Sequence, residues 1–96
     1  MTIPVNWTEQ AELDVDEIMA FIAEDNPRAA IHVVHEIRDA AAQLALFPML
    51  GRAGRVEGTR ELVVLRTPYV IAYRFVANEV TLLHIFHGAR LWPEEL

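Results

Sequence analysis

The 96-residue chain has no cysteine, no lysine and no long apolar run. Without cysteine, a disulfide scaffold and a thiolate metal site are excluded, and we expect the protein to work in the reducing cytoplasm. No apolar stretch reaches the roughly 20 residues that a membrane-spanning helix requires. Residues 1–7 do not have the pattern of a secretory signal. These absences predict one domain, residues 1–96, that acts without a membrane.

The absence of lysine leaves arginine as the only strongly basic residue. All eight basic residues are arginines, and the formal net charge is −6. Residues 1–48 hold nine acidic residues and two arginines, whereas residues 49–96 hold six arginines and five acidic residues. Arginine suits bidentate contacts with phosphate or carboxylate groups, although a GC-rich genome also favours it. Because attraction to nucleic acid scales with the phosphates neutralised, the acidic total argues against strong long-range attraction to RNA or DNA.

The first half of the chain has the pattern of a short strand followed by two helices. Residues 3–7 alternate like an edge strand, Thr8 suits the N-cap of a helix over residues 8–24, and Asn26 suits the N-cap of a second helix over residues 27–46. The short connection predicts an antiparallel helix hairpin. Apolar residues at helical spacing predict its buried stripes, which are Ala11, Val15, Ile18, Met19 and Ile22 in the first helix and Ala30, Ile31, Val34, Ile37, Ala41 and Leu44 in the second.

The second half has the pattern of three consecutive strands. A loop with three glycines, residues 49–58, leads to apolar runs at residues 61–66, 69–77 and 80–87, and short turns separate these runs. Such spacing predicts an antiparallel meander. The complete order, β-α-α-β-β-β, predicts an α+β fold in which the helix hairpin packs on one face of a small antiparallel sheet.

The central strand of the meander is apolar on both sides. Val70, Ala72 and Val76 alternate with Tyr69, Ile71, Tyr73 and Phe75. Because the helix hairpin covers only one face, we expect a partner protein to cover the other with a helix or an added strand. Arg74 interrupts the apolar strand, so we expect its charge to face outward. Together with His87, it suggests a site for anionic groups on the open face of the sheet.

Three segments in the second half carry a family resemblance. They are residues 58–62 (GTREL), 68–74 (PYVIAYR) and 83–90 (LHIFHGAR). Their order, after a strand and a helix hairpin, resembles the RelE/ParE superfamily, the toxins of bacterial type II toxin–antitoxin pairs. The resemblance covers nearly the whole chain. It implies a cytoplasmic toxin without a cofactor or metal, held inactive in a hetero-oligomer by a cognate antitoxin.

Members of this superfamily act in different ways. ParE-like members inhibit DNA gyrase, whereas RelE- and YoeB-like members are endoribonucleases that cleave messenger RNA on the ribosome. We favour gyrase inhibition, because Val70 stands near the position where YoeB-like nucleases have an arginine, and because the chain has no lysine. The alternatives are a ribosome-dependent endoribonuclease and a non-toxic relative that retains only antitoxin binding.

The nuclease alternative predicts a set of catalytic residues. Cleavage through the 2′-hydroxyl needs a base, an acid and a cation for the phosphate. By resemblance to YoeB-like nucleases, Glu57 and His87 match the glutamate and the histidine, and Arg74 replaces the missing cation. Arg74 lies on the same strand face as Val70, four residues further on.

Other polar residues have competing interpretations. Arg60, Arg66 and Arg90 either bind the target or a nucleic acid, or form salt bridges with acidic neighbours or with the antitoxin. His84 and His87 are predicted on opposite faces of their strand, with His84 a half-buried structural residue. His32 and His35 share a helix face, but no third ligand is evident, so we predict no metal site there.

Overall fold

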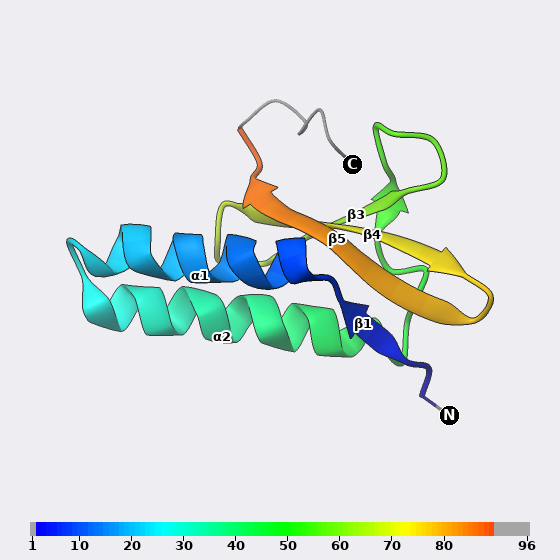
Figure 1. Cartoon of the computed structure of the whole chain (residues 1–96), viewed down its shortest axis with the longest axis horizontal. Helices are drawn as coiled ribbons and strands as arrows, with labels where there is room; N and C mark the ends of the chain where they lie inside the picture. The colour runs from blue at the N-terminus through cyan, green and yellow to red at the C-terminus, as the bar shows by residue number, and fades with distance from the viewer. Residues whose placement is uncertain (1, 90–96) are drawn as a thin grey trace.

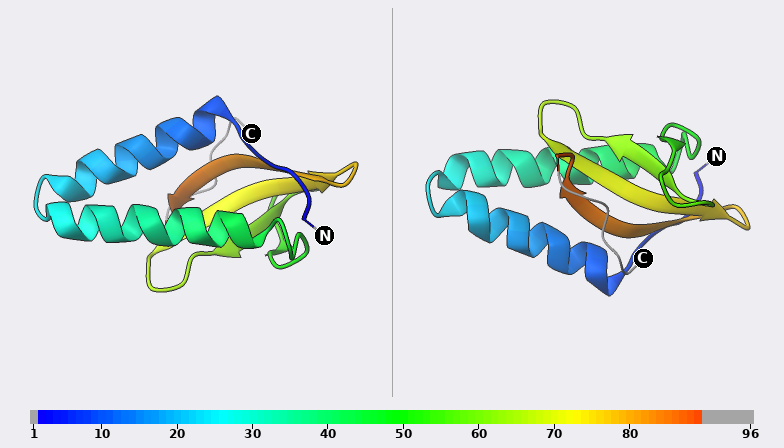
Figure 2. Two further views of the ribbon diagram at one scale, coloured as in Figure 1. Left: turned by 90° about the horizontal axis from the view of Figure 1, so that it is seen from below. Right: turned by 90° about the horizontal axis from the view of Figure 1, so that it is seen from above.

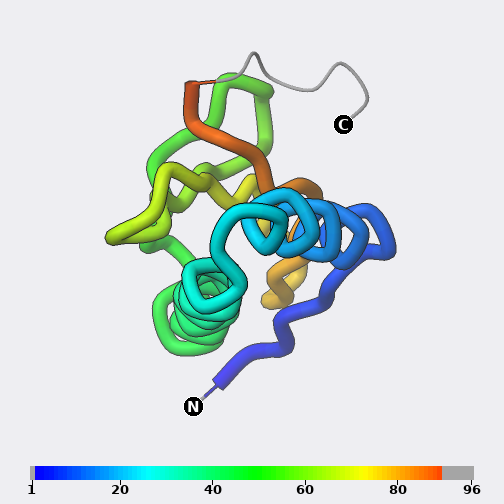
Figure 3. Tube along the Cα trace, turned by 90° about the vertical axis from the view of Figure 1, so that its left-hand side faces the viewer, coloured from blue at the N-terminus to red at the C-terminus, as the bar shows by residue number. Residues whose placement is uncertain are grey.

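The computed structural model describes residues 2–89, which form two helices and a five-stranded sheet (Figure 1). In chain order the elements are β1 (Val5–Trp7), α1 (Glu9–Ala23), α2 (Pro27–Gln43), β2 (Arg52–Ala53), β3 (Arg60–Val63), β4 (Tyr69–Val76) and β5 (Glu79–His87). The α+β class and the helix hairpin on one face of the sheet are confirmed (Figure 3). Neither helix of this described part is long and apolar enough to cross a membrane.

The sheet is mixed, with strand order β1-β5-β4-β3-β2. Strands β3, β4 and β5 form the predicted antiparallel meander, but β1 pairs with β5 in parallel, so the expectation of a wholly antiparallel sheet is wrong. The parallel pairing is possible because the helix hairpin and three strands lie between β1 and β5 in the chain, a connection long enough for both strands to run in the same direction. The two-residue strand β2, within the predicted loop, adds a short edge to β3.

Side-chain caps fix the starts of both helices, as predicted. The Thr8 hydroxyl accepts a hydrogen bond from the Ala11 N–H at 3.1 Å and donates one to the Leu82 carbonyl at 2.7 Å, so it joins α1 to β5. The Asn26 side chain accepts from the Ala29 N–H at 3.1 Å. The predicted end of the second helix is too late, because α2 stops at Gln43 and turns follow.

The main core lies between the helix hairpin and the sheet. Its fully buried members include Ile37 and Leu44 from the second helical region and Ile71, Tyr73 and Leu82 from the sheet. Two residues of the predicted stripes lie outside this core, since Ile31 is 61% exposed and Met19 is 39% exposed. The physical reason is that the turn between the helices projects beyond the sheet, so the helix segments near it lack a covering strand (Figure 2).

Tyr73 connects the loop after α2 to the sheet. Its buried hydroxyl accepts a hydrogen bond from the Gly51 N–H at 2.9 Å and donates one to the Pro48 carbonyl at 2.8 Å. A side chain at position 51 would place a Cβ atom 2.7 Å from the Tyr73 ring, so this close approach requires glycine. Burial raises the pKa of the Tyr73 phenol.

A β-bulge in β5 decides which side chains face the helices. Tyr73 pairs with Leu82 and its neighbour Ala72 pairs with His84, so Leu83 is an extra residue without a partner in the register. Residues after a bulge exchange faces relative to simple alternation. His87 therefore pairs with Tyr69 on the helix side, where its ring lies edge-on at 5.7 Å from the Tyr69 ring. The prediction that His87 lies on the open face is wrong.

Candidate functional site

A buried carboxylate organises the open face of the sheet. Glu61 is only 2% exposed, and its oxygens lie 3.4 Å from Arg52 Nη2 and 3.5 Å from Arg55 Nε. The Arg55 main-chain N–H also donates to Glu61 at 2.9 Å. The Arg55 guanidinium in turn lies 5.8 Å from the centre of the Phe86 ring. Glu61 thus holds the loop of residues 52–59 against the open face.

The apolar cluster on the open face is already buried within this chain. Val70, Ala72 and Phe86 form this cluster and are at most 5% exposed within this chain. The sequence predicted that a partner covers these residues, and that prediction is wrong because the chain buries them itself. Two valines on this face are exceptions: Val63, which pairs with Val70, is 45% exposed, and Val76, near the turn between β4 and β5, is 64% exposed.

Arg74 faces outward on this side of β4, on the same face as Val70 and Ala72. Its Nη1 donates to the Gly58 carbonyl at 3.4 Å, and Gly58 has a positive φ of 81° that favours glycine. Glu57, the residue before Gly58, is exposed in the loop. The contact of Arg74 is therefore with the main chain of the loop that carries Glu57.

Two further arginines that the sequence suggested for target binding make contacts within the chain. Arg60 Nη1 donates to the Gly51 carbonyl at 2.7 Å, on the helix side of β3. Arg66 Nη2 donates to a Glu36 oxygen at 2.9 Å and joins the turn after β3 to α2. This hydrogen bond lowers the pKa of Glu36 and raises that of Arg66. Arg90 lies outside the described residues.

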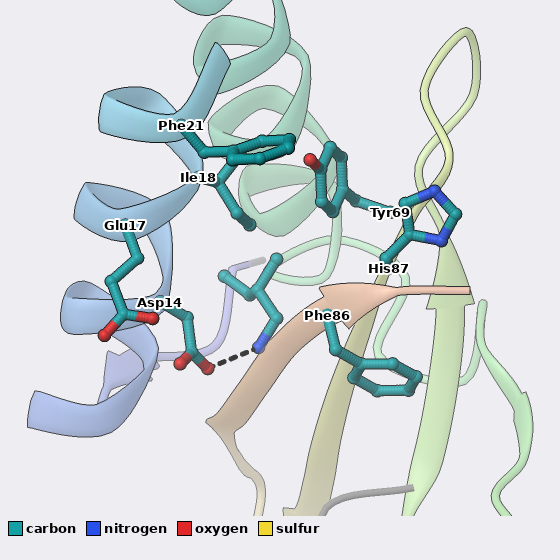
Figure 4. A pocket seen from close by; sticks show the side chains of 8 residues that line it. Asp14, Glu17, Ile18, Phe21, Tyr69, Phe86 and His87 are labelled. Atoms are coloured by element: carbon teal, nitrogen blue, oxygen red, sulfur yellow. Dashed lines mark hydrogen bonds between the residues drawn. The ribbon is translucent and has the colours of Figure 1, made fainter. Parts of the chain in front are cut away.

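His87 lines a groove between α1 and the ends of β4 and β5. The groove has a volume of about 500 Å³ and is also lined by Glu17 and Phe21 of α1 and by Tyr69 (Figure 4). The Ala89 N–H donates to His87 Nδ1 at 3.1 Å, so the neutral ring carries its proton on Nε2. Phe21 is 73% exposed, which leaves an aromatic surface at the mouth of the groove.

The three residues of the nuclease prediction do not form one site. Arg74 lies on the open face, whereas His87 lies on the helix side of the sheet. Tyr69, the partner of His87, precedes Arg74 by five residues, which is about 17 Å along the strand. Glu57 belongs to the loop beside Arg74. A phosphate beside His87 would therefore not meet the Arg74 cation, and the acidic Glu17 shares its groove.

The sequence analysis did not single out Asp14, which shares this groove and is 9% exposed. It accepts hydrogen bonds from the Ile85 N–H at 2.9 Å and from the Gln10 amide at 2.8 Å, and it lies 3.0 Å from His84 Nδ1. The structural role expected for His84 is consistent with this contact. Helical spacing held a signal for Asp14, because position 14 falls on the buried stripe with Ala11 and Ile18.

The histidines of α2 form surface contacts along the helix. His32 lies 3.8 Å from Glu36, and His35 lies 3.2 Å from Asp39, each four residues further on. Within residues 2–89 no group of three or more histidine, aspartate or glutamate side chains is arranged to hold a metal ion.

Comparison with known proteins shows that this chain is similar to a family of toxins. Residues 5–92 match the family described as the ParE toxin of the type II toxin–antitoxin system parDE. The chain is 42% identical to Y4kP of Sinorhizobium fredii, a protein described by its name as a toxin. The similarity extends over 92 residues, which are 96% of this chain and 95% of the relative. It is 38% identical over 87 residues, 91% of its length and 97% of the relative's, to the toxin RelE2 of Caulobacter vibrioides.

Solved structures agree with the family match. A chain of the chromosomal ParDE system from P. aeruginosa matches with a TM-score of 0.79 and 26% identity, over 90% of this chain and 96% of that one. A chain of the toxin–antitoxin complex RelBE2 from Mycobacterium tuberculosis has the same fold, with a TM-score of 0.62 and 24% identity over 91% and 99% of the two chains. The family match and these relatives show that the chain belongs to the ParE toxins, within the RelE/ParE superfamily of type II toxin–antitoxin systems.

Proposed function

We propose that this toxin inhibits DNA gyrase in the cytoplasm by binding it, without cleaving RNA, and that a cognate antitoxin neutralises it. The observation that carries the proposal is the separation of Arg74 from His87 by a sheet and by about 17 Å of strand. A nuclease of this superfamily would need its cation and its acid at one phosphate. A binding inhibitor needs a surface only.

The surroundings of His87 support binding rather than cleavage. Its groove presents the carboxylates of Asp14 and Glu17, which repel a phosphate, beside the aromatic rings of Phe21 and Tyr69. Such a surface suits apolar or basic side chains of a protein target. The likeness to the P. aeruginosa ParDE chain, at a TM-score of 0.79 against 0.62 for the RelBE2 chain, favours the same choice.

The first test is direct inhibition. The purified chain is added to DNA gyrase and relaxed plasmid, and we expect loss of supercoiling. In cells, induction of the chain should raise DNA-damage signalling while transcripts stay intact. Cleaved transcripts with unimpaired supercoiling would overturn the proposal. The second candidate, a ribosome-dependent endoribonuclease, is favoured by the 38% identity to the toxin RelE2. A chain that does not slow growth would instead be a non-toxic relative.

The second test is a substitution that separates chemistry from binding. His87→Gln keeps a hydrogen-bonding side chain of similar size but removes the imidazole. Loss of a true general acid or base lowers a rate by about a hundred- to ten-thousand-fold. We expect His87→Gln to retain most of the growth inhibition. The matched control is His35→Gln, on the exposed surface of α2, with a side chain that is 71% exposed. Complete loss of inhibition in the first variant alone would contradict the proposal.

A further inference from the structure

The groove between α1 and the ends of β4 and β5 combines an exposed aromatic ring with an exposed carboxylate. Phe21 and Glu17 are four residues apart on α1 and both line the groove, so they lie on the same side of the helix (Figure 4). Phe21 is 73% exposed. Within residues 2–89, the Glu17 side chain makes no hydrogen bond and no ion pair. The groove therefore holds a negative charge that no group of this part of the chain neutralises.

Two further side chains decide the charge of the groove. Asp14 is a second carboxylate in its lining and is held in place by the Ile85 N–H at 2.9 Å. His87 Nδ1 accepts a hydrogen bond from the Ala89 N–H, which leaves the ring without a positive charge. Among the described residues, no arginine lines the groove. Two carboxylates beside an exposed aromatic ring, with no cation from residues 2–89, suit a cationic ligand.

Another part of α1 shows how this chain holds an arginine. The Arg38 guanidinium lies 4.8 Å from the centre of the Trp7 ring, and its Nη2 lies 3.3 Å from a Glu12 oxygen. A guanidinium suits such a pair, because its planar group stacks on the ring while its N–H groups donate to the carboxylate. Phe21 and Glu17 present the same two kinds of group further along α1. The groove is therefore better suited to arginine than to lysine.

We propose that the groove of Glu17 and Phe21 binds an arginine side chain of the target protein. This inference rests on the proposed function, inhibition of gyrase by binding. An enzyme that acts on DNA carries basic side chains for the phosphates. Residues 1–48 of this chain, with nine acidic residues and two arginines, attract such a surface. A second copy of this chain, with a net charge of −6, would be repelled.

The first experiment asks whether the groove recognises a guanidinium. The probe is Nα-acetyl-arginine N-methylamide, and the matched control is the citrulline derivative, which has a similar shape without the charge. Amide resonances of the isotopically labelled chain are followed in a titration. We expect shifts at Glu17 and Phe21, with the arginine probe binding at least about threefold more tightly than citrulline. In Glu17→Gln this preference should disappear. Equal affinities for the two probes, or no shift at these residues, would overturn the proposal.

Arg90, which lies outside the described residues, is another source of a guanidinium in this chain. The titration is therefore repeated on the variant Arg90→Gln. We expect this variant to bind the arginine probe with the affinity of the parent chain. Clearly tighter binding by Arg90→Gln would make Arg90 the occupant of the groove and would overturn the proposal.

The second experiment measures binding to intact gyrase and loss of supercoiling, both without the antitoxin. Glu17→Lys reverses the charge in the groove, and Phe21→Ala removes the exposed ring. The matched controls are Asp16→Lys, a neighbouring exposed acid outside the lining, and Leu65→Ala, which shortens a side chain that is 70% exposed in the turn after β3. We expect the first two variants to bind gyrase at least about tenfold more weakly and the controls to bind like the parent.

The outcomes separate the occupants of the groove. Equal weakening by Glu17→Lys and Asp16→Lys would indicate general attraction between charged surfaces and overturn the proposal. Groove variants that bind gyrase normally but lose affinity for the antitoxin, the protein encoded by the neighbouring reading frame, would make the antitoxin the occupant. A dimer of the free chain that Glu17→Lys dissociates, seen by light scattering, would make a second copy the occupant. Either result overturns the proposal.

The two proposals fail in different ways. A parent chain that leaves supercoiling unimpaired contradicts gyrase inhibition. The titration with the arginine probe does not involve gyrase, so it still decides whether the groove is an arginine site. Conversely, a parent chain that inhibits gyrase as strongly as its Glu17→Lys and Phe21→Ala variants supports the proposed function and overturns the role of the groove.

Discussion

Two buried carboxylates in residues 2–89 of this toxin, Asp14 and Glu61, accept hydrogen bonds from parts of the fold that differ in rigidity, a sheet strand and a loop. Asp14 of α1 is 9% exposed and accepts from the Ile85 main-chain N–H, a donor fixed by the sheet. Glu61 of β3 is 2% exposed and lies within 3.5 Å of nitrogens of Arg52 and Arg55, whose side chains are 64% and 45% exposed. One carboxylate joins a helix to the sheet, and the other holds a loop on it.

The two sets of donors respond differently when the carboxylate is removed. A guanidinium on the surface turns to water, whereas the N–H of Ile85, a residue that is 3% exposed, stays in place without a partner. The less buried carboxylate should therefore contribute more to stability. The carboxylate on the helix side thus depends on a main-chain donor of the sheet, whereas the one on the open face depends on a loop N–H and on two exposed guanidinium groups.

The largest effect is expected at Asp14. The substitution Asp14→Ala leaves the Ile85 N–H unsatisfied, and we expect the free energy of unfolding to fall by about 2–3 kcal/mol. Denaturant unfolding measures this change. The control is Asp16→Ala, an exposed acidic residue on the same helix, for which we expect a change of about 0.5 kcal/mol or less. Equal effects of the two substitutions would refute the role given to Asp14.

Glu61→Ala should have a smaller effect on stability. We expect a loss of about 1–2 kcal/mol, because the Arg55 N–H loses its acceptor while both guanidinium groups regain water. Hydrogen exchange of the Arg55 amide should become faster as the loop moves away from the sheet. Glu57→Ala, an exposed residue of the same loop, is the control. A larger loss for Glu61→Ala than for Asp14→Ala would reverse the comparison.

Tyr73 extends the comparison to a buried neutral group. Its pKa is raised above 10.0 by burial, so the folded state holds its proton more tightly than the unfolded state. Stability from this group is complete below pH 10 and should fall as the pH rises through the folded-state pKa. The chain has no lysine or cysteine, so few other side chains titrate there. Thermal unfolding at increasing alkaline pH should show a shallower decline for Tyr73→Phe. An identical decline would contradict this assignment.

The smallest effect is expected at the exposed ion pair of Arg66 with Glu36. Arg66 has a positive φ of 66°, which is strained for a residue with a side chain. Arg66→Gly loses a surface ion pair of little value but relieves this strain. We expect its melting temperature to equal or exceed that of the parent chain, whereas Arg66→Ala should melt slightly lower. A lower melting temperature for Arg66→Gly than for Arg66→Ala would show that strain is unimportant there.

Much of the architecture could be predicted from local patterns. Thr8 and Asn26 cap the helices because their side chains reach an N–H three residues on, which is a local interaction. Helical spacing identified most of the core but also included Ile31, which is exposed because the helix hairpin extends beyond the sheet. The parallel pairing of β1 with β5 joins residues about 75 positions apart, and no local pattern specifies its direction.

The candidate site was less accessible to sequence reasoning. Simple alternation places His87 on the face opposite Val80 and Leu82. The extra residue Leu83 in β5 brings all three to the same face. The contacts of Arg60 and Arg66 with a carbonyl and with Glu36 could not be read from composition, since they join distant segments. In the sequence alone, both arginines are equally compatible with target binding. The fold shows that each has an acceptor within the chain.

Local patterns in the amino-acid sequence specify the helix caps, most of the buried stripes, the three-strand meander and the superfamily, because each is recorded in neighbouring residues or in short segments. Long-range packing, in contrast, places His87 in the helix-side groove and Arg74 against the loop of the open face. Sequence patterns do not reach these features, because the bulge and the buried carboxylate are defined by contacts between distant parts of the chain.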